Sequence, residues 1–263
     1  MGGWPPLDMP LLDIEDLSIR FGGVTALDGV SVAVAEGQIV GIIGPNGAGK
    51  TTVFNCITGV YTPDAGSITF AGLDLRRRQP HQIIGAGVAR TFQNLELFNT
   101  MTVLDNLLVG QHSAMRCNAI EYAFRLPRAS REEHGARLRA GEVLDFLSLS
   151  ELANTVVGGP PFGLKKRVEL ARALVSSPRV LLLDEPANGL SHEEVGQLDV
   201  LIRTLRDDLK LTILLVEHHM GLVMAVSDRV CVLDFGRRIA YGTPAEVQAD
   251  PAVIAAYLGE TVA

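Results

Sequence analysis

The sequence predicts an α/β fold in which a core of strands and helices is interrupted by a helical insertion. Three observations predict this fold: short apolar runs between Gly-rich turns over residues 11–70, a helical apolar period over residues 131–149, and strand-like runs alternating with helical segments after residue 178. The chain has 263 residues, which is enough for one large domain or two lobes with a buried core.

Strands are expected in the N-terminal part of the chain. The apolar runs LLDIEDLSIRF, VSVAVA, QIVGII and SITF are short and lie between turns that contain Gly, which is typical of β-strands. A Gly-rich break at residues 44–49 follows the third run, and we expect a helix to begin after it.

The middle part of the chain is expected to be helical. Over residues 131–149 the apolar side chains recur at helical spacing, while Arg, Glu and Asp occupy the other faces. The apolar positions are Ala136, Ala140, Val143, Leu144 and Leu147. This pattern predicts an amphipathic helix inside the insertion.

The C-terminal part returns to alternating elements. We expect strands at VLLLDE, LTILLVE and RVCVLDFG, with helices near residues 192–209 and 251–258. No internal repeat or low-complexity tract divides the chain further, so two lobes on one polypeptide are the simplest organisation.

Composition excludes several classes of protein. A net charge of −7, from 23 Lys and Arg against 30 Asp and Glu, gives no general attraction for nucleic acid. The three cysteines are odd in number and too widely spaced for a disulfide framework or a CxxC metal site. No apolar run reaches the ~18 residues of a membrane-spanning helix, and the acidic, Pro-containing N-terminus is unlike a signal peptide. We therefore expect a cytoplasmic protein.

The strongest motif is a phosphate-binding loop. Residues 44–51 read GPNGAGKT, a full GxxxxGK[ST] pattern, after the apolar run QIVGII. The glycines allow backbone N–H groups to surround the α- and β-phosphates, Lys50 reaches the β- and γ-phosphates, and the Thr51 hydroxyl ligates Mg²⁺. The alternative is a Gly-rich turn without a ligand, which the expected strand before it and helix after it argue against.

A second motif supplies carboxylates. The run VLLLDE ends in Asp184, the type of residue through which phosphate-loop proteins hold Mg²⁺. Glu185 follows directly, and because successive strand residues point apart, we expect it to face the attacking water as a general base. Alone, the pair would also fit an ordinary strand that ends before a Pro turn.

Together these motifs resemble the nucleotide-binding subunits of ABC transporters over nearly the whole chain. The matching stretches are GPNGAGKTT at 44–52, RTFQN at 90–94, FGLKKRVELARAL at 162–174, LLLDEP at 181–186 and VEHH at 216–219. More narrowly, residues 21–31, 90–110 and 242–260 are similar to the ATP-binding subunit of branched-chain amino acid importers.

The resemblance implies an α/β P-loop NTPase of the ABC cassette type. Such a cassette has a RecA-like core, an N-terminal antiparallel β subdomain and an α-helical subdomain insertion. We expect it to span residues 11–260, with the core at about 11–92 and 176–260 and the helical subdomain at about 93–175.

The resemblance also implies cofactors and partners. ATP and Mg²⁺ are expected, with ATP hydrolysis energising import of branched-chain or related amino acids. The expected partners are transmembrane permease subunits, a second ATP-binding subunit that is a different or an identical chain, and indirectly an external substrate-binding protein, but no nucleic acid. The chain is then peripheral on the cytoplasmic face of the cell membrane.

Residue by residue, the resemblance assigns the nucleotide contacts. Phe21 matches the aromatic residue that stacks on adenine, with an ordinary core Phe as the alternative. The loop residues expected to bind ATP are Gly44, Pro45, Asn46, Gly47, Ala48, Gly49, Lys50, Thr51 and Thr52.

The residues implied in hydrolysis come from three segments. Gln93 matches the glutamine that touches Mg²⁺ and the attacking water, so that Thr51, Gln93 and Asp184 form the expected metal set beside the base Glu185. His218 matches the switch histidine that bonds the γ-phosphate. A metal site formed by adjacent histidines is the weaker alternative there, because the sequence offers no third ligand.

Two positions depart from the family pattern. The usual LSGGQ signature is PPFGL here, and Gly163 alone remains to contact ATP on a partner subunit, since Pro161 replaces the Ser donor. Ser191 stands where the family often has Asp. A hydroxyl there retains a capacity to hydrogen bond across a dimer but loses the charge.

A docking groove for the membrane partner is expected between Gln93 and Gly110. Its apolar lining residues would be Leu95, Leu97, Phe98 and Met101, with the core of the helical lobe as the alternative location for these side chains.

Two alternative functional classes have sequence features that this chain lacks. An ABC-type ATPase of a regulatory or nucleic-acid-maintenance system usually carries two cassettes in one chain or a long coiled coil, and neither is visible. A phosphate-loop GTPase would need an NKxD-type guanine reader, which the sequence lacks.

Overall fold

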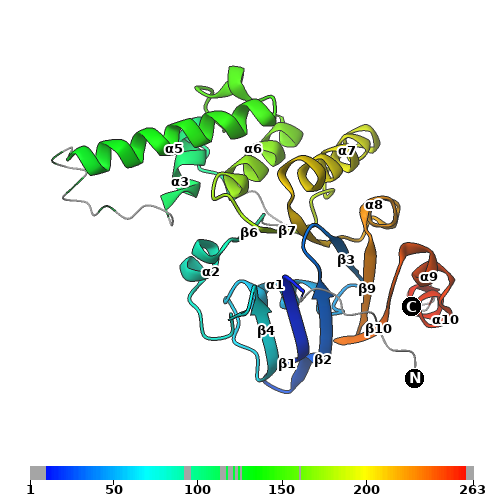
Figure 1. Cartoon of the computed structure of the whole chain (residues 1–263). Helices are drawn as coiled ribbons and strands as arrows, with labels where there is room; N and C mark the ends of the chain where they lie inside the picture. Colours follow the sequence, from blue (N-terminus) through cyan, green and yellow to red (C-terminus); the bar gives the residue numbers. More distant parts are fainter. Residues whose placement is uncertain are drawn as a thin grey trace.

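Two β-sheets and a group of helices make up the described part of the chain. The computed structural model describes residues 10–91, 96–112, 117, 121, 124, 126–159 and 161–258. Figure 1 shows the two sheets in the lower part of the view and the helices α3, α5 and α6 above them.

The first sheet is antiparallel and N-terminal. Its strand order is β2-β1-β4-β5, and every pairing within it is antiparallel. The strands are β1 (Leu12–Phe21), β2 (Val24–Val34), β4 (Ala65–Phe70) and β5 (Leu73–Asp74). The antiparallel subdomain expected from the resemblance is confirmed.

The second sheet is mostly parallel and carries the order β10-β9-β3-β8-β7-β6. Its strands are β3 (Ile39–Ile43), β6 (Val88–Arg90), β7 (Val180–Asp184), β8 (Thr212–Val216), β9 (Arg229–Asp234) and β10 (Arg237–Gly242). All five residues of β3, β7 and β8 are buried, as expected for central strands covered on both faces. Among the described strands of this second sheet, only β10 runs antiparallel to its neighbour. Neither β10 nor the short strands β5 and β6 was expected from the apolar pattern.

Helices cover the second sheet and form the insertion. They are α1 (Lys50–Ile57), α2 (Pro80–Ala86), α3 (Val103–Gly110), α5 (Pro127–Phe146), α6 (Phe162–Leu174), α7 (His192–Leu209), α8 (Met220–Val226), α9 (Pro244–Ala249) and α10 (Pro251–Leu258), with a 3₁₀ turn at Ser150–Leu152. The helices expected at 192–209 and 251–258 are confirmed with these bounds.

The amphipathic helix of the insertion is confirmed with shifted ends. It begins at Pro127, where Pro is favourable in the first turn, and it ends at Phe146 because Ser148 adopts a left-handed backbone with φ +54°. Its buried side chains include Ala140, Val143 and Leu144, which pack with α3 and α6 in one apolar cluster. The three helices therefore form one packed unit on top of the second sheet (Figure 1).

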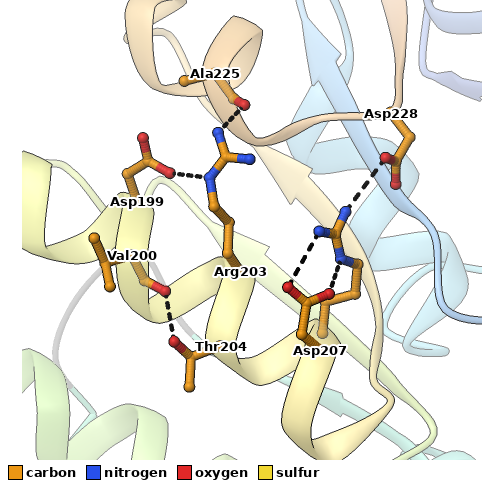
Figure 2. A network of polar contacts seen from close by, with 8 residues as sticks. Asp199, Val200, Arg203, Thr204, Asp207, Ala225 and Asp228 are labelled. Atoms are coloured by element: carbon orange, nitrogen blue, oxygen red, sulfur yellow. Dashed lines mark hydrogen bonds and ion pairs between the residues drawn. The ribbon is translucent and has the colours of Figure 1, made fainter.

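Polar contacts fix α7 to the rest of the core. Arg203 bonds Asp199 on its own helix (2.6 Å) and the carbonyl oxygen of Ala225 at the end of α8. Arg206 joins Asp207 to Asp228, which also accepts a hydrogen bond from Ile39 N at the start of β3 (2.8 Å). Figure 2 shows Arg203 of α7 between Asp199 and Ala225 of α8, and Asp207 of α7 linked through an arginine to Asp228, which precedes β9.

Within the described ranges, no helix is both long enough and apolar enough to cross a membrane.

Candidate functional site

The ends of three neighbouring strands bring the sequence motifs together. In the parallel pairings, Ile42 of β3 and Asp184 of β7 both lie level with Val216 of the intervening strand β8. The carboxyl ends of parallel strands meet at one edge of a sheet, where ligands bind in open α/β folds. The phosphate loop, Glu185 and His218 therefore all follow strands that end at this edge.

The phosphate loop adopts a conformation that depends on glycine. Gly44, Gly47 and Gly49 have φ angles of +149°, +80° and +100°. A methyl group at Gly49 would lie 2.8 Å from the carbonyl oxygen of Ala26 on β2, so the first sheet presses against the loop at this point. Gly49 is also the N-terminal cap of α1 and provides no side-chain acceptor. The first N–H groups of α1 thus lie at a helix N-terminus that favours an anion.

Lys50 lies across the loop. Its Nζ donates to the carbonyl oxygens of Gly44 (2.6 Å) and Pro45 (2.9 Å), and the residue is only 6% exposed. The ammonium group is therefore held inside the ring of loop residues, where it adds positive charge to the helix N-terminus. Thr51, the next residue on α1, is exposed.

Asp184 is buried and paired with an arginine that the sequence reasoning did not single out. Its Oδ2 lies 2.6 Å from Arg90 Nη2, and both side chains are buried. Arg90 Nη1 donates in addition to Asn55 Oδ1 on α1 (2.7 Å), and the guanidinium lies over the Phe54 ring, 5.5 Å from its centroid. Arg90 therefore joins the strand end of β7 to the helix that follows the phosphate loop.

The two oxygens of Asp184 differ in environment. Burial raises the pKa of Asp184 above its usual value, and the hydrogen bond and charge of Arg90 oppose that rise. Oδ2 is occupied by Arg90, whereas Oδ1 is buried and has no hydrogen-bond partner among the described residues. A buried carboxylate oxygen without a partner is costly unless a cation or water binds it.

Glu185 lies in a turn and not in a continuous strand, which the sequence argument did not expect. The sequence argument assumed a continuous strand, but β7 ends at Asp184 and Glu185 has a left-handed backbone with φ +47°. Glu185 N still donates to Val216 O (2.8 Å), so the turn is attached to β8. Its carboxylate is 15% exposed and lies 3.9 Å from His218 Nδ1, which places the two residues expected to act in hydrolysis side by side.

Phe21 lies at the end of β1 and is 45% exposed, so the alternative of an ordinary core residue is wrong. Its ring meets Tyr61 edge to face, with centroids 4.9 Å apart and planes at 65°. Tyr61 follows α1 and its N–H donates to Asn55 O (3.0 Å). An exposed aromatic face next to the phosphate-loop helix is suited to stacking on a base.

Part of the segment PPFGL, which stands in place of the usual signature, forms the start of α6. Pro161 caps the helix without a side-chain hydrogen bond, and a methyl group at Gly163 would collide with the carboxylate of Glu194 on α7. The Ser191 hydroxyl accepts a hydrogen bond from Glu194 N (3.3 Å). In return, Glu194 Oε2 accepts a hydrogen bond from Ser191 N (2.8 Å), and this bond to its carboxylate holds the pKa of Glu194 below its usual value. Ser191 is therefore a helix cap within its own chain.

Some residues that the sequence analysis singled out either lie outside the described residues or lie in a different environment from the one expected. Gln93 and Leu95 lie outside the described residues. Of the proposed groove residues, Leu97 is only 8% exposed and packs in the core of the helical lobe, so assigning it to a docking surface was wrong. Phe98 and Met101 are exposed, at 47% and 38%.

Comparison with models of known protein families shows the family of this chain. A model described as ABC transporter matches residues 27–188, from the middle of β2 to the loop before α7, and thus covers more than half of the chain. The chain belongs to the ABC transporter family. A second model, described as branched-chain amino acid ATP-binding cassette transporter, matches residues 237–263.

Individual ABC transporter proteins match over nearly their full length. A protein of Pseudomonas aeruginosa named high-affinity branched-chain amino acid transport ATP-binding protein BraF is 44% identical over 97% of this chain and all of that protein. The Escherichia coli K12 protein of the same description, LivG, is also 44% identical with the same coverage. A Methanocaldococcus jannaschii protein named probable branched-chain amino acid transport ATP-binding protein LivG is 36% identical, over 96% of this chain and 98% of its own.

Solved structures of ABC cassettes share the fold. The ADP conformation of MJ1267, an ATP-binding cassette of an ABC transporter, superposes with a TM-score of 0.83 at 33% identity, covering 96% of this chain and all of the other. A nucleotide-free cassette from an ABC transporter gives a TM-score of 0.82, also at 33% identity. The expected fold class is thereby confirmed.

Sequence reasoning missed two charged residues of this ABC site. Arg90 ends the short strand β6, and Glu217 directly follows β8 with its side chain fully buried. The available signal was similar in both cases: a charged residue stands at the end of an apolar strand or directly after it, next to a motif residue, as in RTFQN and VEHH.

Replacing Arg90 with Met tests the buried ion pair. The change leaves the Asp184 carboxylate buried without its counter-ion, and we expect it to lower the free energy of unfolding by about 3–5 kcal/mol. Urea denaturation of the full chain measures this loss.

The matched control is Arg137→Met, which breaks an exposed pair with Glu133 and should change stability by less than about 0.5 kcal/mol. Adding Asp184→Leu to Arg90→Met should restore most of the loss, because no charge is then buried alone. Equal stability of Arg90→Met and the control would contradict this description of the pair.

Proposed function

We propose that this chain is the ATP-binding subunit of an importer for branched-chain amino acids and that it hydrolyses ATP to energise transport. The observation that carries the proposal is the meeting of the phosphate loop, Asp184, Glu185 and His218 at the ends of β3, β7 and β8. The named relatives and the match at residues 237–263 support the transported class.

ATP binding is assigned to the phosphate loop and Phe21. The N–H groups of residues 44–52 surround the α- and β-phosphates, and Lys50 moves from its loop carbonyls to the β- and γ-phosphates. This exchange is favourable because a phosphate oxygen offers a full negative charge in place of a carbonyl dipole. Phe21 stacks on adenine with the face that Tyr61 leaves open.

The residues present fit a magnesium ion. Oδ1 of Asp184 is a buried oxygen without a hydrogen-bond partner in the described part of the chain, and oxygen ligands are those that Mg²⁺ prefers. Asp184 Oδ1 and the Thr51 hydroxyl would hold the ion together with Gln93. When bound, Mg²⁺ neutralises negative charge on the β- and γ-phosphates.

Hydrolysis is assigned to Glu185 and His218, whose Oε2 and Nδ1 atoms lie 3.9 Å apart. Glu185 accepts a proton from the attacking water, and its partly exposed carboxylate is accessible to that water. His218 donates a hydrogen bond to the γ-phosphate and thereby helps to orient it for attack. The adjacent His219 caps α8 by accepting from Leu222 N (3.2 Å), so we assign it no part in this step.

A second ATP-binding subunit contributes the remaining contacts to each ATP site. The start of α6 faces the γ-phosphate bound to that partner, with the N–H of Gly163 and the helix dipole as its remaining donors. Pro161 provides no donor, so the partner's ATP is hydrolysed more slowly than the ATP bound to this chain when the two subunits differ. In a homodimer both sites would be weakened.

The remaining partners follow from the proposed transport. Permease subunits cross the membrane, the external binding protein delivers the amino acid to them, and this chain stays at the cytoplasmic face of the membrane. The comparisons give no support to a regulatory or nucleic-acid-maintenance ATPase.

Replacing Glu185 with Gln tests the general base. The amide cannot accept the proton, and we expect the rate of ATP hydrolysis by the assembled transporter to fall by about 10²–10⁴-fold. Affinity for ATP should remain, because the phosphate loop is unchanged. Hydrolysis at the wild-type rate would contradict the role of Glu185.

Replacing Phe98 with Asp tests docking to the permease. A charge on this exposed apolar side chain should prevent co-purification with the membrane subunits while ATP binding by the full chain is unchanged. Val200→Asp, at a 65% exposed position on α7, is the matched control and should leave assembly intact. Normal assembly of the Phe98 variant would refute the docking surface.

A further inference from the structure

The side chain of Glu217 is fully buried and lies between two loops of the site. Its Oε1 accepts a hydrogen bond from Ala187 N at 2.6 Å. Its Oε2 accepts from the N–H groups of His218 (2.9 Å) and His219 (3.0 Å). One carboxylate therefore receives three backbone donors.

The two loops joined in this way carry the residues assigned to hydrolysis. Ala187 lies two residues after Glu185, in the loop that leads from β7 to α7. The other donors belong to the loop between β8 and α8, which contains the switch histidine. Glu217 is thus attached directly to the backbone of His218 and, through Ala187, to the turn that orients Glu185.

Two carboxylates also lie near one nitrogen of the His218 ring. His218 Nδ1 lies 3.9 Å from Glu185 Oε2 and 3.9 Å from Glu217 Oε2. The His218 side chain itself is 59% exposed, so few packing contacts hold it in place. Its position is set mainly by the backbone of its loop, and that backbone is bonded to Glu217.

Burial makes this arrangement rigid. A buried carboxylate is strongly destabilised unless its oxygens accept hydrogen bonds, and bonds to an ionised acceptor are about twice as strong as neutral ones. Losing any of the three donors would leave part of this buried carboxylate without a hydrogen bond. The two loops are therefore constrained to move as one unit.

We infer that Glu217 is a positioning residue that holds the backbone of His218 at a fixed place relative to the Glu185 turn. The inference rests on the proposed function of His218. It predicts that Glu217 affects the step that needs the γ-phosphate and has little effect on binding of ADP, which lacks that phosphate.

The test compares Glu217→Gln, His218→Ala and the double variant in the assembled transporter. An amide has one acceptor oxygen and one NH₂ group, so Gln cannot accept from both loops. We expect Glu217→Gln to lower kcat for ATP hydrolysis by about 10–100-fold, as loss of an orienting partner does at other catalytic sites. The dissociation constant of ADP, measured on the full chain, should change less than about twofold, because ADP has no γ-phosphate for His218 to contact.

Two further variants complete the design. Glu142→Gln makes the same chemical change at an exposed position of α5 and should leave kcat unchanged. Glu217→Asp keeps both carboxylate oxygens on a side chain too short to reach both loops. It should lower kcat with ADP affinity retained, and it replaces Glu217→Gln as the test if the Gln variant does not fold.

The outcomes separate this inference from the proposed function. If Glu217 acts through His218, adding Glu217→Gln to His218→Ala lowers kcat no further. A wild-type kcat for His218→Ala would overturn the role of His218 and this inference with it. A slow His218→Ala beside a normal Glu217→Gln would overturn this inference alone. Fully additive losses of kcat in the double variant would also overturn this inference alone. Loss of ADP binding in Glu217→Gln would do the same.

Discussion

The parallel pairing of β3, β8 and β7 is the constraint on which the rest of the structure depends. Because the three strands are in register at Ile42, Val216 and Asp184, the residues that follow them are neighbours, although they lie far apart in the sequence. The sheet is buried on both faces, against α1 and the first sheet on one side and against α7 and α8 on the other. A strand shifted by one residue would exchange its two buried faces and draw a residue from beyond one end into the core, so packing fixes the register and thereby the site.

Much of this arrangement could be predicted from the sequence. The phosphate loop has a fixed spacing because its glycines are needed for positive φ angles, and the apolar runs of β3, β7 and β8 are continuous because both faces are buried. The helix 192–209 was predicted with the observed bounds, since its polar start and Ser cap are local signals. The antiparallel order of the first sheet came from the family resemblance.

Other features could not be predicted because they depend on contacts distant in sequence. The bond from Arg90 to Asp184 spans 94 positions, and the one from Glu217 to Ala187 spans 30. The turn at Glu185 needs a left-handed backbone that nothing in LLLDEP indicates. Burial of Leu97 beside exposed Phe98 likewise depends on the packing of α3 and α6, which apolar composition alone does not specify. The role of Gln93 stays a prediction.

The central claim is that Asp184 and the phosphate loop form one site for ATP and Mg²⁺. The most direct measurement is the affinity of the full chain for ATP, with and without Mg²⁺, in the wild type and in Asp184→Asn. Loss of the carboxylate should remove the gain in affinity that Mg²⁺ gives and leave the affinity without Mg²⁺ nearly unchanged, because Lys50 and the loop N–H groups remain. An equal gain from Mg²⁺ in both proteins would contradict the account.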